Sequence, residues 1–379
     1  MKSLATRPLW LTRLALPAAA LLTVIGGGVA SASVYHGPSH ARGYGAPARP
    51  AQARQPAGFS WHSLTLLDGW QTASSKLLVT GKPGWAVRDG VVYLRGAVKQ
   101  PNPSGNATFG SLPKGARPAH NLYIEIYTNS DTPGILYIGS NGKMEAYDGN
   151  AYTFASLAGV SFPTAAVKSH PLSLEHGWES SQSIYNTGNP AYAVSNGVVY
   201  LSGSLHSAGS SHLAFTLPKA ARPAHVMYIS VYTFDGAVGW LEILPTGQVD
   251  VDGSDAASYT SLARISFPVA RTSWHDFRLE DGWKSGASHY HTGAPAYAVI
   301  NGVVYLGGAM YQPSPSTGLW TDIPAAARPA NVLELEVYTV DGTAGAVAMT
   351  DSLGLVSSNP FSDAEEFTSL AGLSYPPSA

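Results

Sequence analysis

Acidic and histidine side chains, the usual general acids and bases, recur in this sequence without forming a repeated catalytic set. The chain contains three copies of one motif, and a catalytic pair that belonged to the motif would be present in every copy. The two best-matched acidic positions hold Asp68, His176 and Asp281 in one case, and Glu125, Ser230 and Glu336 in the other. A nucleophile elbow, a P-loop and a helix that carries a His-x-x-x-His motif are absent from the sequence. We therefore expect no catalytic residues and a protein that is not an enzyme.

Candidate metal ligands are equally sparse. His62, His170 and His275 occupy the same place in each copy, but one His per copy does not build a metal site alone. We expect each of them to be a buried, hydrogen-bonded side chain. The sequence therefore predicts no metal site and no cofactor.

Tyrosines alternate with apolar residues along one predicted central strand of each copy. In the first copy, residues 122–128 place aliphatic side chains on one face and Tyr123, Glu125 and Tyr127 on the other. A tyrosine on an outward face suits a sugar ring or a protein, because the ring offers apolar area and the hydroxyl offers a hydrogen bond. We expect the ligand-binding residues to be Tyr123, Tyr127, Tyr228, Tyr232 and Tyr338. The alternative is that another sheet or loop of the same copy covers these tyrosines.

The elements that position these residues are β-hairpins. Asp-Gly or Asn-Gly pairs at 89–90, 196–197 and 301–302 each separate two apolar runs, and such pairs form two-residue turns. In the first copy this turn predicts a register in which Val91 and Tyr93 share a mixed face. The opposite, core-facing set is Trp85, Val87, Val92 and Leu94. A second hairpin is expected at 141–142.

Composition and spacing favour an all-β protein built from repeated modules. Only 12% of the residues are charged, 40 are Gly, 27 are Pro and none is Cys, which excludes a disordered chain, a coiled coil and a disulfide scaffold. The motif Gly-Val-Val-Tyr-Leu begins at Gly90, Gly197 and Gly302, so the repeat is the size of a domain. Each copy reads as seven or eight strands without a helix. We expect three tandem antiparallel β-sandwich or jelly-roll-like modules, at residues 59–167, 168–271 and 272–379.

Two further segments precede the modules. Residues 1–32 combine basic residues, an apolar run and a small-residue exit, which is typical of a secretory signal peptide, and the run is too short to span a membrane. Residues 33–58 are rich in Pro, Ala and Arg and are expected to be a flexible linker. Beyond the linker acidic residues outnumber basic ones, so we expect no nucleic-acid partner. The sequence thus predicts a secreted, extracellular protein.

The order of motifs in each copy resembles the C-terminal β head modules of tailed-phage tail-tip, baseplate and tail-fibre proteins. The resemblance rests on Asn-Gly-Val-Val-Tyr-Leu, then Leu-Pro-x-x-x-Arg-Pro-Ala, a tyrosine-bearing strand, and a closing Ser-Phe-Pro. It implies a small β module that trimerises and binds host-surface saccharide, and it assigns no ligand residue. Because three copies share one chain, it further implies an internal pseudo-threefold head. The faces that would meet are Val91, Tyr93, Val198, Tyr200, Val303 and Tyr305, with separate modules on a string as the alternative.

The sequence favours a secreted, non-catalytic protein that binds a glycan or a cell-surface protein through tyrosine faces and variable loops. Two alternatives stay open. One is a structural or assembly component without a small ligand. The other is an extracellular hydrolase that would take an acid pair from Asp363, Glu365 and Glu366, although such neighbouring acids are more typical of a solvated loop.

Overall fold

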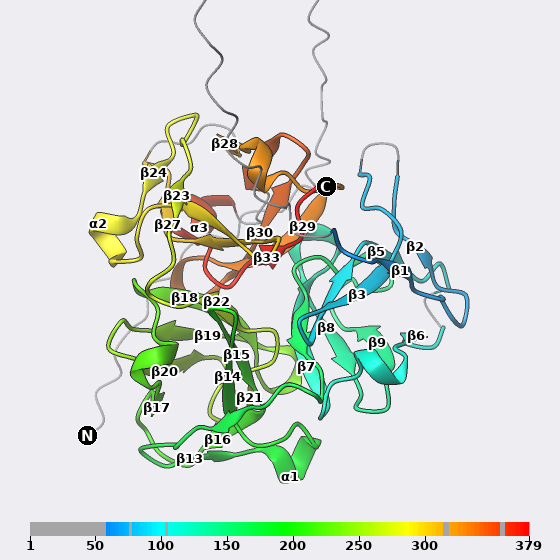
Figure 1. The fold of residues 1–379 in the computed structure, drawn as a ribbon, viewed down its shortest axis with the longest axis horizontal. Helices are drawn as coiled ribbons and strands as arrows, with labels where there is room; N and C mark the ends of the chain where they lie inside the picture. The colour runs from blue at the N-terminus through cyan, green and yellow to red at the C-terminus, as the bar shows by residue number, and fades with distance from the viewer. Residues whose placement is uncertain (1–57, 76–77, 103–104, 314–317, 357–360, 379) are drawn as a thin grey trace, which may run out of the picture. The chain divides into compact units, whose positions relative to one another are not determined.

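The computed structural model describes residues 58–75, 78–102, 105–313, 318–356 and 361–378. The predicted signal peptide at 1–32 and all but the last residue of the predicted linker at 33–58 lie outside these described residues. Within the described residues the fold is all-β, as expected, and its strands form antiparallel sheets (Figure 1). We use repeat 1, repeat 2 and repeat 3 for residues 59–167, 168–271 and 272–379.

Repeat 1 contains three sheets. The first sheet, in spatial order, is β1 (His62–Ser63), β3 (Gly84–Arg88), β4 (Val91–Arg95) and β11 (Ser161–Pro163). The second is β10 (Ala155–Ser156), β5 (Ala97–Lys99) and β2 (Gln71–Thr72). The third is β6 (Thr108–Ser111), β9 (Lys143–Tyr147), β8 (Pro133–Ile138) and β7 (Leu122–Tyr127).

Repeat 2 contains the same three sheets. The first is β12 (His170–Pro171), β14 (Ala191–Ser195), β15 (Val198–Ser202) and β22 (Ser266–Pro268). The second is β13 (Trp178–Ser180), β16 (Ser204–Ser207) and β21 (Thr260–Ser261). The third is β17 (Leu213–Thr216), β20 (Gln248–Gly253), β19 (Val238–Ile243) and β18 (Met227–Tyr232).

Repeat 3 follows the same plan. The first sheet is β23 (His275–Asp276), β25 (Ala296–Ile300), β26 (Val303–Gly307) and β33 (Ser374–Tyr375). The second is β24 (Lys284–Ser285), β27 (Ala309–Tyr311) and β32 (Thr368–Ser369). The third is β28 (Leu319–Asp322), β31 (Leu353–Val356), β30 (Ala344–Met349) and β29 (Leu333–Tyr338). Among the described strands, every sheet draws on a single repeat.

Helical segments are short and lie between strands. The α-helices are α1 (Gln182–Tyr185), α2 (Ala287–Tyr290) and α3 (Phe361–Glu366). The 3-10 turns are η1 (Lys114–Ala116), η2 (Asn129–Asp131), η3 (Lys219–Ala221), η4 (Phe234–Gly236), η5 (Ala325–Ala327) and η6 (Val340–Gly342). Each repeat has eleven described strands where the sequence indicated seven or eight, because short two- and three-residue strands complete the sheets.

The predicted hairpin register is confirmed. Arg88 pairs with Val91 across the Asp89-Gly90 turn, Val87 with Val92, and Trp85 with Leu94. Both turn residues have positive φ, which the Asp-Gly pair supplies at low cost. The same register recurs in the β14–β15 and β25–β26 hairpins. The second predicted hairpin is also present, between β8 and β9.

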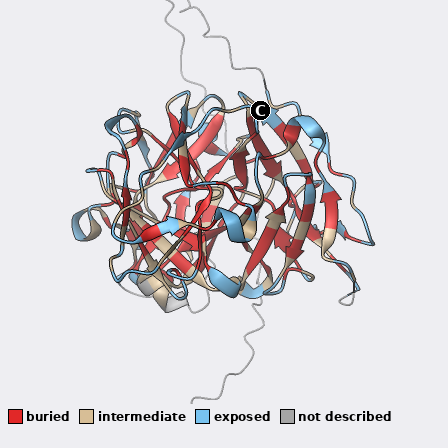
Figure 2. Cartoon of the chain, turned by 90° about the horizontal axis from the view of Figure 1, so that it is seen from below, coloured by how far each residue is buried: buried red, intermediate tan, exposed pale blue. Residues whose placement is uncertain are grey.

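The core of each repeat lies between its sheets, with buried strands inside and exposed turns outside (Figure 2). In repeat 1, Val92 and Leu94 from β4 pack against apolar residues of β7, β8 and β9. The predicted core face extends less far than expected, because Val87 is 39% exposed. The equivalent Val194 and Val299 are also exposed, so the core face ends before this position in every repeat.

Candidate functional site

The three repeats contact one another in a closed ring. One serine of each repeat donates a side-chain hydrogen bond to a carbonyl of its neighbour: Ser156 to Glu334 (2.7 Å), Ser261 to Tyr123 (2.6 Å) and Ser369 to Tyr228 (2.7 Å). One backbone amide at each boundary does the same: Asn121 to Asn186 (3.0 Å), Val226 to His291 (3.1 Å) and Val332 to Val79 (2.9 Å). Repeat 3 therefore meets repeat 1 through the contacts that join repeats 1 and 2.

The six residues proposed as inter-repeat faces lie together where the repeats meet. They form one buried cluster, which we call the axis cluster: Val91, Tyr93, Val198, Tyr200, Val303 and Tyr305. The hydroxyls of Tyr200 and Tyr305 are 3.2 Å apart. Burial raises the pKa of all three tyrosines, which keeps their hydroxyls neutral. The axis cluster is thus a buried contact between neutral side chains.

Of the predicted ligand-binding tyrosines, Tyr123, Tyr228, Tyr232 and Tyr338 lie at boundaries between repeats. Tyr123 of repeat 1 stacks on Tyr232 of repeat 2, with ring centroids 5.9 Å apart, and Tyr228 of repeat 2 stacks on Tyr338 of repeat 3 at 5.5 Å. Tyr127 packs edge-on against Phe154 of its own repeat. Burial raises the pKa of Tyr232 to about 12.

This placement corrects the expectation of an outward tyrosine face. Alternation along β7 does separate Tyr123 from the core of its own repeat, since the aliphatic residues of that strand lie in the core. The opposite face is covered, however, because repeat 2 packs against it through Tyr232 and Tyr259. Tyr127 is covered by its own repeat, as the alternative expected, whereas the cover of Tyr123 comes from another repeat, which neither interpretation included.

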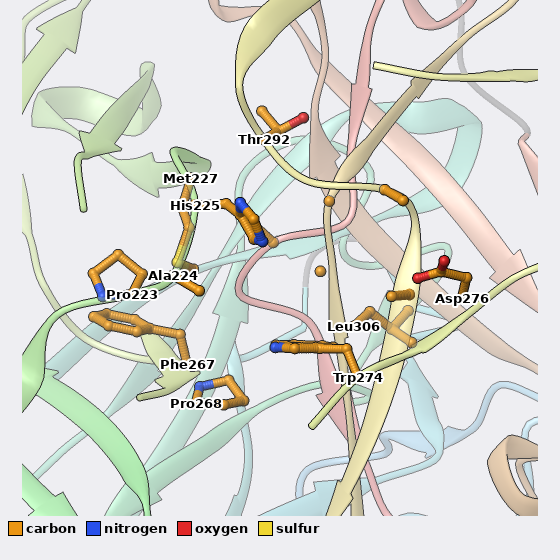
Figure 3. Close-up of a pocket in the computed structure, with 15 residues that line it drawn as sticks. Pro223, Ala224, His225, Met227, Phe267, Pro268, Trp274, Asp276, Thr292 and Leu306 are labelled. Carbon is orange, nitrogen blue, oxygen red and sulfur yellow. The ribbon is translucent and has the colours of Figure 1, made fainter. Parts of the chain in front are cut away.

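A cleft between repeats 2 and 3 is open to solvent and combines aromatic with polar side chains (Figure 3). Repeat 2 contributes His225 and Phe267, and repeat 3 contributes Trp274, Asp276 and Thr292. The cavity has a volume of about 100 Å³. We call it cleft 2/3.

A second cleft lies at the equivalent place between repeats 1 and 2, and we call it cleft 1/2. His120, Phe162 and Thr187 line it at the positions that His225, Phe267 and Thr292 hold in cleft 2/3. Its volume is about 310 Å³, because Ser169 and Pro171 replace the larger Trp274 and the acidic Asp276. The two clefts therefore have the same His, Phe and Thr at equivalent positions, but only cleft 2/3 has the Trp274 indole and the Asp276 carboxylate.

Glycines fix the histidines that line both clefts. Gly293 has a φ of +76° and Gly188 a φ of +75°, and each lies directly against an imidazole of the preceding repeat. A Cβ on Gly293 would lie 2.8 Å from Cδ2 of His225, closer than packed atoms approach. At the third boundary Asn331 lies against Gly81 in the same way. The Thr-Gly dipeptide and the residue after Arg-Pro-Ala recur in the sequence, and this signal could have indicated the clefts.

Trp274 is held by a second close approach. A Cβ on Gly307 would lie 2.9 Å from the Trp274 indole, so the ring packs flat over that glycine while also lining cleft 2/3. In repeat 1 the equivalent indole, Trp61, is covered by the Arg95 guanidinium at 4.3 Å from the ring centroid. In repeat 2 a serine replaces the indole. Among the described residues, the Trp-over-Gly arrangement therefore belongs to repeat 3.

The histidines that precede the Gly-Trp motif of each repeat are exposed, although we expected them to be buried. They are His62, His170 and His275. His62 stacks on Trp85 with ring centroids 4.4 Å apart, and His170 stacks on Tyr192 at 5.3 Å. They lie on two-residue edge strands, where one ring face packs on a neighbouring aromatic ring and the other meets water. None of the described His, Asp and Glu side chains form a group of three or more that could hold a metal ion.

The acids considered for a hydrolase belong to α3. Asp363 accepts a hydrogen bond from Thr343 Oγ1 at 3.2 Å, Glu365 is half-buried and Glu366 is exposed. They lie on a short helix, where a solvated loop was expected.

None of the helices among the described residues is both long and apolar enough to cross a membrane.

Comparisons with protein-family models, curated proteins and solved structures gave no significant match to the chain. What the chain binds is therefore inferred from its own residues. Cleft 2/3 is the place where an open cavity, an indole, a carboxylate and an imidazole coincide.

Proposed function

We propose that the protein is a secreted, non-catalytic carbohydrate-binding protein whose ligand occupies cleft 2/3. The observation that carries the proposal is the Trp274 indole lining an open cavity beside polar groups of two repeats. Small-ligand sites combine an apolar, aromatic wall with a few convergent polar groups, and this cleft has that composition.

The indole supports a sugar more than a flat apolar ligand. Trp274 offers an apolar ring face of the kind on which the C–H face of a pyranose stacks. Asp276 accepts hydrogen bonds from sugar hydroxyls, and Thr292 and His225 add further polar groups around the same cavity. A neutral hexose unit satisfies both kinds of contact at once.

Cleft 1/2 is proposed as a second, weaker subsite of the same class. It retains His120 and Thr187 and adds Gln182 and Asn189, whose amides donate and accept hydrogen bonds. It has no indole, because Ser169 takes the place of Trp274. We therefore assign the dominant affinity to cleft 2/3.

Two further arguments support this class of ligand. The predicted signal peptide would deliver the protein to the surface where cell-wall and capsular glycans lie. The repeat also resembles phage head modules, a family that binds host saccharide. A partner protein bound through the same cleft is the alternative that the test must separate.

A glycan array followed by calorimetric titration of the best hit tests the proposal. The full secreted chain is expected to give discrete sugar hits. Trp274→Ala should then weaken binding by about tenfold or more, the change that ~1.4 kcal/mol of lost stacking produces. Its melting temperature should fall, because the indole also packs over Gly307 and against the axis cluster, so affinity is compared at a temperature at which both proteins are folded.

His275→Ala is the matched control. His275 is the next residue along the chain, is exposed and packs at a tilt against Tyr297 without lining the cleft, so its loss should leave affinity unchanged. An array without hits, together with concentration-dependent oligomers, would favour the assembly component instead. Sugar hits that persist in Trp274→Ala would refute the assignment of cleft 2/3.

A further inference from the structure

Two buried carboxylates face each other where the three repeats meet. Glu125 on β7 and Glu336 on β29 hold equivalent positions, and each is only 4% exposed. Ser230 on β18 holds the third position and is 9% exposed. The three strands contact one another pairwise, so these side chains converge on the centre of the ring. We call Glu125, Ser230 and Glu336 the axis acids and serine.

No N–H or O–H group of the described residues donates a hydrogen bond to either carboxylate, and the Ser230 hydroxyl also lacks a partner. The two carboxyl groups are instead close enough to hydrogen-bond to each other once one of them carries a proton. Buried carboxylates without donors are costly unless a proton or a cation neutralises them.

One cation is already built into the site. Arg264 lies close enough to both acids to interact electrostatically with each, and its Nη1 donates a hydrogen bond to the Glu125 carbonyl at 3.1 Å. It has a φ of +71°, at the position where repeats 1 and 3 have Gly159 and Gly372. A side chain there strains the backbone, and the charge that Arg264 brings to the two acids accounts for its presence.

The ionised side chains of this cluster leave one negative charge to be neutralised. Two carboxylates and one guanidinium sum to a single negative charge in a buried site. A proton shared between the carboxyl groups removes this charge and makes the hydrogen bond that both groups lack. A cluster of two acids, one serine and one arginine is thus complete with one proton.

We propose that Glu125 and Glu336 share one proton at the centre of the ring, and that protonation of this pair stabilises the closed arrangement of the three repeats, so that stability is greatest in acid and falls as the pH rises. The site is a proton lock that is separate from the clefts and independent of what they bind.

The direction of the pH dependence follows from burial. Burial raises the pKa of Glu125 from an ordinary 4.5 to about 7, and burial together with the neighbouring carboxylate also raises the pKa of Glu336. The folded protein therefore holds a proton that the unfolded chain has released. Stability is fully present below about pH 4.5 and falls as pH rises through about 7.

Other buried acids lie nearby and must be separated from the lock. Burial raises the pKa of Glu334, which is two residues before Glu336, to about 7, and raises that of Asp131. Asp131 interacts with Tyr127 and with both glutamates of β29. These groups lie at the boundary between repeats 3 and 1, and they titrate in the same direction.

Urea unfolding of the full chain between pH 5 and pH 8 tests the proposal. For wild type, the folding equilibrium constant should fall on the order of 1,000-fold or more across this range, because Glu125 and Glu334 each release a proton near pH 7 in the folded protein. Glu125→Gln should remove a fall on the order of 100-fold from that dependence, because Glu336 alone is balanced by Arg264. Glu336→Gln should do the same, and it serves if the first variant fails to fold. Arg264→Gly, which restores the glycine of the other repeats, should steepen the dependence because two acids then lack a cation.

Two controls define the result that would overturn the lock. Glu366→Gln removes an exposed acid and should leave the pH dependence unchanged, whereas Glu334→Gln should remove only a part of it. A flat wild-type profile, or a slope that is as steep in Glu125→Gln and in Glu336→Gln as in wild type, refutes the proposal. Recovery of stability at pH 8 by sodium chloride but not by choline chloride would assign the site to a metal cation, and would also refute it.

Discussion

At the scale of residues, the boundaries between repeats depend on a few glycines that neighbouring rings cover. Gly188 and Gly293 have positive φ and lie directly against His120 and His225. A glycine there serves two purposes, because it adopts the left-handed conformation without strain and leaves room for the imidazole. Each therefore sets how closely one repeat approaches the next, and where the cleft histidine lies.

Gly293→Ala should be more destabilising than an alanine at another left-handed glycine. Gly197 is the matched control, since its φ is +83° and no atom lies within 4 Å of the place that a Cβ would take there. Gly197→Ala should cost about 1 to 2 kcal/mol, the strain of the left-handed conformation alone. Gly293→Ala should cost clearly more, because it also displaces His225. Urea unfolding measures both, and equal losses would show that His225 moves freely.

At the scale of elements, the central strands β7, β18 and β29 have two buried faces. One face packs into the core of its own repeat, and the other meets the neighbouring repeats through stacked tyrosines. Tyr123 illustrates the second face, because its ring contacts Tyr137 of its own repeat and three tyrosines of repeat 2. Each of these strands therefore contributes to the packing of its own repeat and of a neighbouring repeat.

Tyr123→Ala should lower the free energy of unfolding by about 3 kcal/mol, as for other large aromatic side chains that lose packed neighbours. Tyr123→Phe keeps the ring and should cost less than about 1 kcal/mol. Thermal or urea unfolding of both variants checks the difference. An alanine variant as stable as wild type would mean that the tyrosine face is open in solution and available to a ligand.

The sequence was sufficient to predict features within one repeat, such as hairpin register, but not the surfaces and sites that form between two repeats. The Asp89-Gly90 turn was sufficient for the register of its hairpin, because a two-residue turn fixes which residues pair. Alternation placed Tyr123 away from the core of its own repeat, but no pattern within one repeat states what covers the far face. The result is that tyrosines expected to bind a ligand lie in an interface.

The clefts were missed for the same reason. Cleft 2/3 takes His225 from one repeat and Trp274 from the next, and these residues belong to different recurring motifs. Glu125 and Glu336 were recognised as equivalent, with Ser230 between them, but were considered only as a catalytic pair. That Arg264 stands where the other repeats have glycine was visible in the sequence, and its meaning depends on the acids that it approaches.

At the scale of the whole molecule, the ring of contacts makes the three repeats interdependent. The boundary between repeats 3 and 1 has the serine and amide hydrogen bonds of the other two boundaries, although the chain does not pass directly across it. The described residues from 58 onward accordingly form one compact unit. Loss of one boundary should therefore weaken all three repeats.

Tyr200→Glu should destabilise the entire ring. It places a carboxylate in the uncharged axis cluster, beside the Tyr305 hydroxyl, and should cost about 3 kcal/mol or more. Tyr192→Glu is the control, because Tyr192 is a half-buried tyrosine of the same repeat that packs on His170 and the core of repeat 2, outside the axis cluster. Its loss should affect repeat 2 without placing a charge where the three repeats meet. Calorimetry should show one transition for wild type and a lower one for Tyr200→Glu. Separate transitions, with only that of repeat 2 shifted, would indicate independent modules.

Covalent fusion of the three copies permits a centre that identical subunits could not have. A homotrimer must place the same side chain three times around its rotation axis, so a glutamate there would bring three carboxylates and no compensating arginine. Within one gene, each copy diverges separately, and the centre here holds Glu125, Ser230 and Glu336 with a single Arg264. The three repeats thus keep the same backbone fold while the side chains at equivalent positions differ. For the same reason, cleft 2/3 has Trp274 where cleft 1/2 has Ser169.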